Sequence, residues 1–261
     1  MKVFQNKTVL VTGAAGAIGQ ALCQHFLQGG AKVIALDCQR ESLQQFINTV
    51  KGMLIFPVTA DITRVEEVKK AIHSMIPQSG AVDILINNAG ASDNPTLKKM
   101  NIAAWHREID LNLSGAFHCV EAVRDNMMAN RSGVIINISS VNALAAFGNP
   151  AYSAAKAGLI SYTQALAMEL GPYGIRANAI CPGTVRTPAW EARVKKNPHL
   201  FTELIKWYPL QRLAEPDDIA AAVSFLASPQ ARVISGVVLP VDAGLMAGNR
   251  LFARALTLEE F

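Results

Sequence analysis

The chain has 261 residues, of which 51% are hydrophobic and 17% are charged, and its formal net charge is +4. This balance is typical of one well-filled globular α/β domain and excludes a disordered chain. The positive charge is modest and dispersed and no apolar run is long enough for a membrane-spanning helix, so we expect neither a nucleic-acid nor a membrane partner.

Short β-branched runs alternate with longer segments of helical periodicity along the chain. Continuous apolar strands separated by helices predict a parallel sheet covered on both faces. We therefore predict a doubly wound (Rossmann) α/β fold, built as a single domain over residues 1–248 with 249–261 as a C-terminal tail. The runs that predict its seven strands are 8–12, 32–37, 53–58, 82–88, 133–139, 175–180 and 236–242.

The first predicted strand runs into TGAAGAIG, where Gly13, Gly16 and Gly19 stand three apart at a strand-to-helix turn. A turn without Cβ atoms lets the backbone approach a pyrophosphate, and the following helix N-terminus offers free N–H groups. A tight structural turn is the alternative interpretation. The position of the loop between the first strand and the first helix favours nucleotide binding.

Polar residues also follow the next three strands. Asp37 can accept hydrogen bonds from an adenosine ribose and would repel a 2′-phosphate, so it favours NAD over NADP; a helix N-cap is the alternative. Asp61 is expected either to bind an adenine amino group or to cap the next helix. In the NNAG turn, Asn88 can lock neighbouring backbone groups, while Ala89 and Gly90 leave room for a flat cofactor.

The stretch AYSAAKAGLI carries Tyr152 and Lys156 four residues apart, on one face of a predicted helix. The plain interpretation is a surface tyrosine beside a solvated lysine. The alternative is a general acid/base whose pKa is lowered by a neighbouring cation.

Taken in order, TGAAGAIG, Asp61, NNAG, Asn112, NISS, YSAAK and NAICPGTVRT resemble the classical short-chain dehydrogenase/reductase family over roughly residues 5–247. The resemblance implies a catalytic asparagine, serine, tyrosine and lysine. The asparagine corresponds to Asn112, in the long helix before the fifth strand. The tyrosine and lysine correspond to the pair in YSAAK.

The serine has two candidates. Counting forward from the strand motif selects Ser140, whereas counting back from Tyr152 selects Ser139. We predict Ser140, because a strand cannot slip by one residue without turning its side chains to the other face, while the following loop can lose a residue.

The resemblance also implies the roles of these residues. Lys156 lowers the pKa of Tyr152 and holds the nicotinamide ribose, Tyr152 exchanges a proton with the alcohol, Ser140 orients the substrate oxygen, and Asn112 supports a water chain. The residues implied to contact NAD are Gly13, Gly16, Ile18, Gly19, Asp37, Asp61, Ile62, Asn88, Ala89, Gly90, Tyr152, Lys156, Pro182, Gly183, Val185 and Thr187. The scattered cysteines and histidines predict no metal site.

The segment 184–215 has no clear strand and predicts an insertion of short helices that serves as a substrate lid over the ligand cleft. Its aromatic residues offer apolar surface, and its basic residues indicate an anionic or polar substrate. The alternative is a solvated helix with its aromatic residues turned into the core or a subunit interface. The aromatic residues are Trp190, Phe201, Trp207 and Tyr208, and the basic ones are Arg186, Arg193, Lys195 and Lys196.

We therefore expect a cytoplasmic, NAD(H)-dependent oxidoreductase that interconverts a small-molecule secondary alcohol and a ketone. The resemblance implies a homotetramer that pairs its long fourth and fifth helices across subunits. An NADP-dependent 3-oxoacyl reductase and a non-catalytic nucleotide-binding relative are the alternatives. Asp37 argues against the first, and the presence of Tyr152 and Lys156 argues against the second. The Tyr-x-x-x-Lys spacing disfavours the enoyl reductases of the same fold, which use a wider gap.

Overall fold

Seven parallel strands form one sheet in the order β3-β2-β1-β4-β5-β6-β7 in the computed structural model, which describes residues 2–93 and 96–259. The predicted fold class is confirmed. Chain order reverses between β1 and β4, and ligands of doubly wound sheets bind beyond the carboxyl ends of the strands at such a reversal. The strands are β1 (Thr8–Thr12), β2 (Lys32–Asp37), β3 (Ile55–Thr59), β4 (Ile84–Asn87), β5 (Gly133–Ile138), β6 (Ile175–Pro182) and β7 (Val238–Val241).

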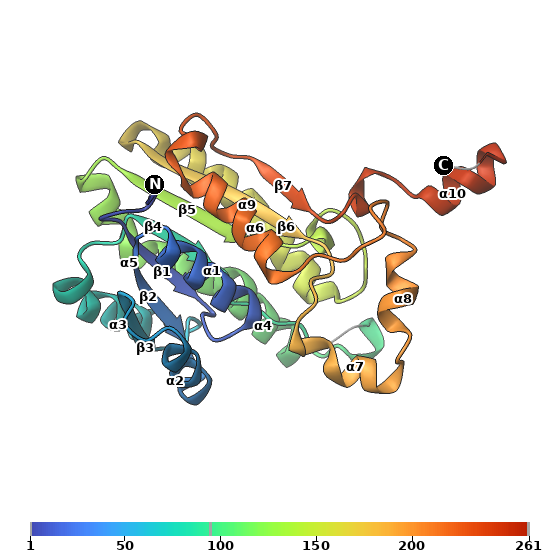
Figure 1. The fold of residues 1–261 in the computed structure, drawn as a ribbon, viewed down its shortest axis with the longest axis horizontal. Coiled ribbons are helices and arrows are strands. Elements are labelled where there is room, and N and C mark those ends of the chain that lie inside the picture. The colour runs from blue at the N-terminus through green and yellow to red at the C-terminus, as the bar shows by residue number, and fades with distance from the viewer. Residues whose placement is uncertain (1, 94–95, 260–261) are drawn as a thin grey trace.

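Helices cover both faces of this sheet, as Figure 1 shows. One face packs against α1 (Ala17–Gln28), α2 (Arg40–Thr49) and α9 (Pro216–Ala227). The other face packs against α3 (Val65–Ser79), α5 (Gly115–Ala129) and α6 (Pro150–Leu170). Short 3₁₀ turns occupy Leu97–Lys99, Val141–Ala143, Gly171–Tyr173, Pro188–Trp190, Pro229–Ala231 and Leu245–Ala247.

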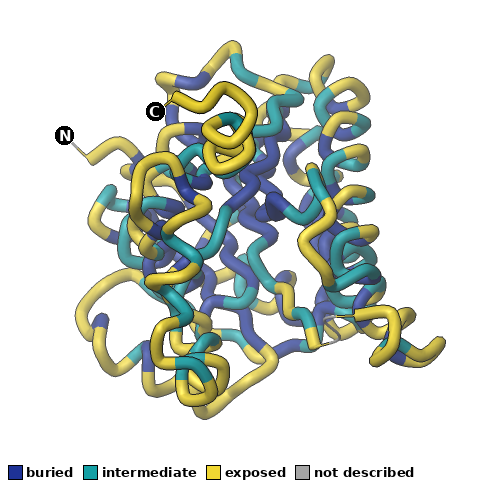
Figure 2. The backbone as a smooth tube through the Cα atoms, turned by 90° about the vertical axis from the view of Figure 1, so that its right-hand side faces the viewer, coloured by how far each residue is buried: buried dark blue, intermediate teal, exposed yellow. Residues whose placement is uncertain are grey.

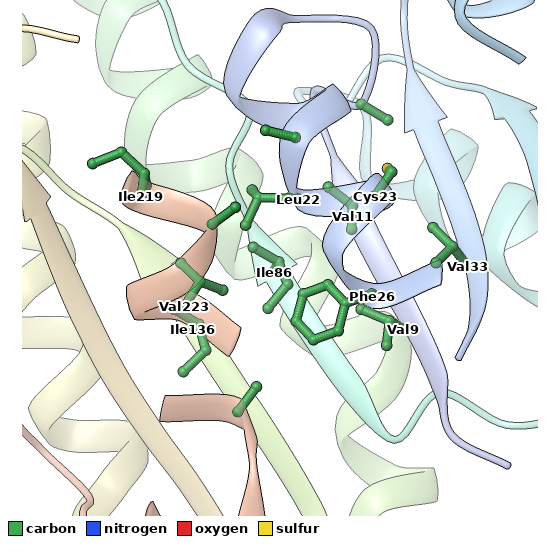
Figure 3. Packing of buried hydrophobic residues seen from close by; sticks show 14 of the residues in the cluster. Val9, Val11, Leu22, Cys23, Phe26, Val33, Ile86, Ile136, Ile219 and Val223 are labelled. Carbon is green, nitrogen blue, oxygen red and sulfur yellow. The ribbon is translucent and has the colours of Figure 1, made fainter. Parts of the chain in front are cut away.

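The two cores follow from the alternation of side chains along each strand. Val9 and Val11 of β1 belong to the core on the α1 side, and Figure 3 shows Val9 beside the fully buried ring of Phe26 and Val11 beside Leu22. Leu10, between them, belongs to the opposite core together with Ile72 of α3. Because both faces are covered, the strands are largely apolar, and polar residues such as Thr12, Asp37 and Asn87 lie at their carboxyl ends.

The long helix expected before the fifth strand is interrupted. A π-helical turn over Asp110–Ser114 separates α4 (Ile102–Ile109) from α5. Within it, the side chain of Asn112 donates to the backbone oxygen of Glu108 at 2.9 Å. Such a bond competes with the regular helical ladder, and π turns of this kind occur frequently at functional sites.

Between β6 and α9 the chain forms the short helices α7 (Glu191–Lys196) and α8 (Leu200–Ile205). Figure 1 shows them beside the end of the sheet toward which the strand arrows point. A parallel β-bridge between Val185 and Ala214 closes the base of this insertion. Nearby, the buried Tyr208 hydroxyl donates to Thr184 Oγ1 at 2.8 Å and accepts from the Thr184 backbone N–H.

The C-terminal helix α10 (Arg250–Thr257) projects from the body of the molecule, as Figure 1 shows, and the final two residues of the predicted tail lie outside the described residues. Leu251, Phe252 and Leu256 expose apolar side chains on it. In Figure 2 this helix is yellow over a dark blue interior. None of the described helices is both long enough and apolar enough to cross a membrane.

Candidate active site

A cavity of about 760 Å³ lies between the carboxyl ends of the strands and the insertion between β6 and α9. It brings together ten of the residues predicted for the site, which come from five separate segments of the chain. These residues are Ile18, Asn88, Gly90, Ser140, Tyr152, Lys156, Pro182, Gly183, Val185 and Thr187.

The other predicted residues do not line this cavity and lie on neighbouring loops and helices and at the end of β2. They are Gly13, Gly16, Gly19, Asp37, Asp61, Ile62, Ala89 and Asn112.

The glycine loop after β1 has the close approaches that its sequence predicts. Gly13 has φ of +64°, and a Cβ there would lie 2.8 Å from Ala89 Cα. Gly19 packs directly against the Gly13 carbonyl, where a Cβ does not fit. Helix α1 follows Gly16 without a side-chain cap, so its first N–H groups are free to bind an anion. These features fit a dinucleotide pyrophosphate.

Asp37 joins the end of β2 to this loop. Its carboxylate, which is 8% exposed, accepts from the backbone N–H groups of Ala15 and Gln39, each at 2.9 Å. The N-cap position of α2 belongs to Gln39, and no side chain caps that helix. The alternative of a helix-capping Asp37 is therefore wrong. A fixed carboxylate beside the nucleotide loop fits a ribose.

Asp61 and Ile62 follow β3. The Asp61 carboxylate accepts from the backbone N–H of Thr63 at 2.9 Å and from its hydroxyl at 2.8 Å, which closes a local turn. The cap position of α3 is Arg64, so Asp61 does not cap that helix, and its contact with adenine stays a prediction. Ile62 is 6% exposed and packs under Gly115 of α5.

Asn88 locks β4 to the end of β1. Its side-chain amide donates to the backbone oxygens of Thr12 at 2.9 Å and Gly13 at 3.2 Å. The backbone N–H groups of Asn88 and Ala89 both donate to Thr12 Oγ1 at 3.0 Å. The NNAG turn therefore fixes the glycine loop in place through hydrogen bonds that the sequence pattern anticipated.

Tyr152 and Lys156 lie on the first turns of α6, which faces the cavity. The Lys156 ammonium is 5.6 Å from the centre of the Tyr152 ring and donates to the backbone oxygen of Ile138 at 2.8 Å. Lys156 is 3% exposed, so this lysine is not a solvated surface residue. The plain interpretation of the pair is therefore wrong.

The two serines after β5 face different partners. Ser139 Oγ donates to the backbone oxygen of Lys156 at 2.9 Å. Ser140 Oγ accepts from the Asn142 backbone N–H at 3.1 Å and is in polar contact with the Tyr152 hydroxyl. The geometry thus places Ser140 beside Tyr152, whereas its catalytic role stays a prediction.

The electrostatics of the pair differ from the expectation that Lys156 lowers the pKa of Tyr152. Burial raises the pKa of Tyr152 above its ordinary value, and the contact with Ser140 only partly opposes this. Burial also lowers the pKa of Lys156 to about 8. The physical reason is that desolvation dominates both groups, while the ammonium binds the Ile138 carbonyl rather than the phenol.

Asn112 reaches the site through Gly90. Its amide donates to the backbone oxygen of Ala91 at 2.8 Å, and its oxygen accepts from the Ala91 N–H at 3.2 Å. A Cβ on Gly90 would lie 2.6 Å from Asn112 Oδ1 and 3.1 Å from Lys156 Nζ. The glycine therefore lets Asn112 and Lys156 approach each other.

Several residues of the cavity were missed by sequence reasoning. Most of them lie on the loop between β5 and α6, and the others precede α4 or follow β7. The sequence offers a signal for Asn149, a polar residue directly before the proline that starts α6. The missed residues include Ser92, Asn142, Phe147, Asn149 and Leu245.

The parallel sheet, the uncapped helix at the glycine loop and the placement of Tyr152 and Lys156 beside the cavity define a Rossmann-type fold with a candidate site at the carboxyl ends of its strands. A family model described as enoyl-(acyl carrier protein) reductase matches residues 13–246. The chain belongs to the short-chain dehydrogenase/reductase family and is an oxidoreductase.

Three similar proteins span almost the whole chain. A crystal structure of a short-chain dehydrogenase/reductase family oxidoreductase from Burkholderia thailandensis is 50% identical, with a TM-score of 0.94 and coverage of 98% of both chains. An uncharacterized oxidoreductase of Schizosaccharomyces pombe is 40% identical over 94% of this chain and 93% of that protein. A 3-oxoacyl-[acyl-carrier-protein] reductase of Thermotoga maritima is 34% identical over 93% and 99%.

Proposed function

We propose that the protein is an NAD(H)-dependent oxidoreductase that interconverts a secondary alcohol and a ketone, with Tyr152 as general acid/base. The observation that carries this proposal is the group of Ser140, Tyr152 and Lys156 on one wall of a single cavity. The pair on α6 is four residues apart, a spacing that favours the carbonyl reductases of the family over its enoyl reductases.

Each residue has a role that its position supports. Ser140 orients the substrate oxygen, and Tyr152 gives or takes the proton on that oxygen. Lys156 supplies a fixed positive charge, and Asn112 holds the loop at Gly90 open beside it. A bound nicotinamide cofactor supplies the hydride donor or acceptor and, when oxidised, a positive charge that lowers the pKa of Tyr152 against the effect of burial.

The preference for NAD rests on Asp37. A 2′-phosphate next to this carboxylate would bring two negative charges together in a poorly solvated place. We expect NADH to bind about tenfold or more tightly than NADPH, as measured by fluorescence titration. Asp37→Asn keeps a hydrogen-bond acceptor for the Ala15 N–H and removes the charge, so it should reduce the difference between the NADH and NADPH affinities. Asp37→Ala also removes the charge and should reduce the same difference. Equal affinities in the wild type would contradict the proposal.

A 3-oxoacyl reductase that uses NADP is the second candidate, because the relative from Thermotoga maritima is named for reduction of a 3-oxoacyl substrate. The carboxylate of Asp37 argues against its cofactor. A single screen decides between the two functions. Oxidation of sugars, hydroxy acids, steroids and polyols with NAD is assayed beside reduction of a 3-oxoacyl thioester with NADPH. Turnover only in the second assay would favour the reductase, and turnover in neither would favour a non-catalytic relative.

We also propose that the protein is a homotetramer that pairs α5 and α6 with those of a second copy. The outer face of these helices exposes Phe117 and Met168, and it has a groove lined by Leu113, Phe117 and Tyr162. Light scattering should give four times the mass of the chain. Phe117→Lys should lower that mass, because it introduces a charge into the paired face.

A further inference from the structure

Arg193 of α7 lines the cavity and has no acidic partner among the described residues. Its guanidinium lies 4.8 Å from the centre of the Trp190 ring, which also lines the cavity. By contrast, Arg186 does not line the cavity, stacks on Phe201 and lies 3.6 Å from the carboxylate of Glu215. Arg193 thus differs from the other basic residues of the insertion in facing the substrate space.

The charge of the lining is one-sided. In the described part of the chain, no aspartate or glutamate lines the cavity, and its cationic residues are Lys156 and Arg193. Lys156 belongs to the reacting end, where its ammonium is bound to the Ile138 carbonyl. Arg193 lies on the opposite wall and keeps its donors for a ligand. A cavity with this sign of charge attracts anions.

The lining also holds polar atoms that make no hydrogen bond within the described chain. Asn149 Oδ1 and Ser92 Oγ are buried and have no partner. Asn149 stands at the N-cap of α6 with φ of +51°, yet its side chain does not cap the helix. Buried polar atoms are almost always satisfied in native proteins, and strained residues concentrate at binding sites. Both residues line the cavity, which indicates a polar ligand.

We propose that the substrate is an anionic secondary alcohol, a hydroxy acid or hydroxyalkyl phosphate, whose anionic group is bound by Arg193. This inference rests on the proposed function, because it takes the reacting oxygen to lie at Ser140 and Tyr152. The carbon skeleton spans the distance between the two walls along the apolar side chains of Phe147, Leu204 and Trp207. Arg193 is a specificity-determining residue in this arrangement and takes no part in the proton transfer.

Binding tests the inference without relying on turnover. Levulinate and dihydroxyacetone phosphate are titrated into the NADH-loaded protein beside methyl levulinate and dihydroxyacetone, with tryptophan fluorescence as the readout. We expect at least one anion to bind about tenfold more tightly than its neutral partner, the effect of hydrogen bonds to a charged group. The comparison between the two anions tells a carboxylate from a phosphate. If neither is preferred, the inference is wrong, whether or not the enzyme turns over.

Two variants test whether Arg193 causes the preference for the anion. Arg193→Gln should remove the preference for the anion, whereas Lys195→Gln, which removes an equal charge from the same helix outside the cavity, should keep it. Kinetics give a second readout with 4-hydroxypentanoate and its methyl ester. Arg193→Gln should raise KM for the acid about tenfold more than it raises KM for the ester. A preference that survives Arg193→Gln overturns the inference, and failure to oxidise any alcohol counts against the proposed function alone.

Discussion

The wall of the cavity formed by β5 and α6 and the wall formed by the insertion between β6 and α9 are built differently. On the first, Ser140 and Lys156 are almost fully buried, and Lys156 is bound to backbone oxygen. On the second, Arg193 is exposed, and its guanidinium stacks on the ring of Trp190, in the 3₁₀ turn before α7. Burial and backbone bonds fix geometry, whereas exposed side chains adapt. The comparison teaches that the groups proposed to react are held by burial and backbone hydrogen bonds, whereas the groups proposed to select the substrate lie on an exposed surface.

The largest loss of activity should come from a change on the wall formed by β5 and α6. Tyr152→Phe keeps the ring and removes the hydroxyl, so we expect kcat to fall by about 10² or more while NADH still binds. Steady-state kinetics and a cofactor titration measure the two properties. A variant that keeps most of its activity would show that Tyr152 is structural and that the comparison between the walls is mistaken.

Variants of Ser139 and Ser140 test which of the two serines on the wall formed by β5 and α6 takes part in the reaction. Ser140→Ala should lower kcat about tenfold, because a hydrogen bond to the reacting oxygen is lost. Ser139→Ala should leave kcat nearly unchanged and reduce the free energy of unfolding by about 1 kcal/mol, because its hydroxyl serves the Lys156 backbone. Kinetics and urea unfolding of both variants separate the roles. The reverse pattern would make Ser139 the catalytic serine.

Limited proteolysis probes the other wall. If residues 184–215 form a mobile lid, trypsin should cut first near Lys195 and Lys196 and should cut several-fold more slowly with NADH and substrate bound. The bridge of Val185 to Ala214 and the buried Tyr208 hydroxyl should keep the base of the segment intact. Slow cutting that ligands do not change would mean that the insertion is as rigid as the opposite wall.

The smallest effect is a pH dependence of stability. Burial lowers the pKa of Lys156 to about 8 from 10.5, so the unfolded chain binds more protons between these values and stability rises with pH there. Relative to Lys156→Met, the wild type should gain about 1 kcal/mol between pH 7 and pH 9. Urea unfolding at the two pH values measures the difference. The thiols of Cys23 and Cys119, whose pKa values are raised by burial, contribute equally to both proteins and cancel, whereas the thiol of Cys181 interacts with Lys156 and is replaced by Ala in both proteins of the comparison. Parallel curves would mean that Lys156 is not desolvated.

Local sequence patterns predicted much of the fold and of the candidate site. The seven strands follow from β-branched runs, and the place of the glycine loop follows from its position between a strand and a helix. Tyr152 and Lys156 share a face because helix geometry places residues four apart on one side. The segment from Thr184 to Glu215 was recognisable because it lacks a strand and carries prolines.

Tertiary structure decided what depends on residues distant in the sequence. Counting could not choose between Ser139 and Ser140, whereas the packing of β5 against α6 gives each hydroxyl its own partner. The sign of the Tyr152 pKa shift also lay beyond the sequence, because burial by neighbouring elements outweighs the spacing to Lys156. Of the basic residues in the insertion, only the fold selects Arg193 as the one that faces the cavity, since the turn of a short exposed helix is set by what it packs against.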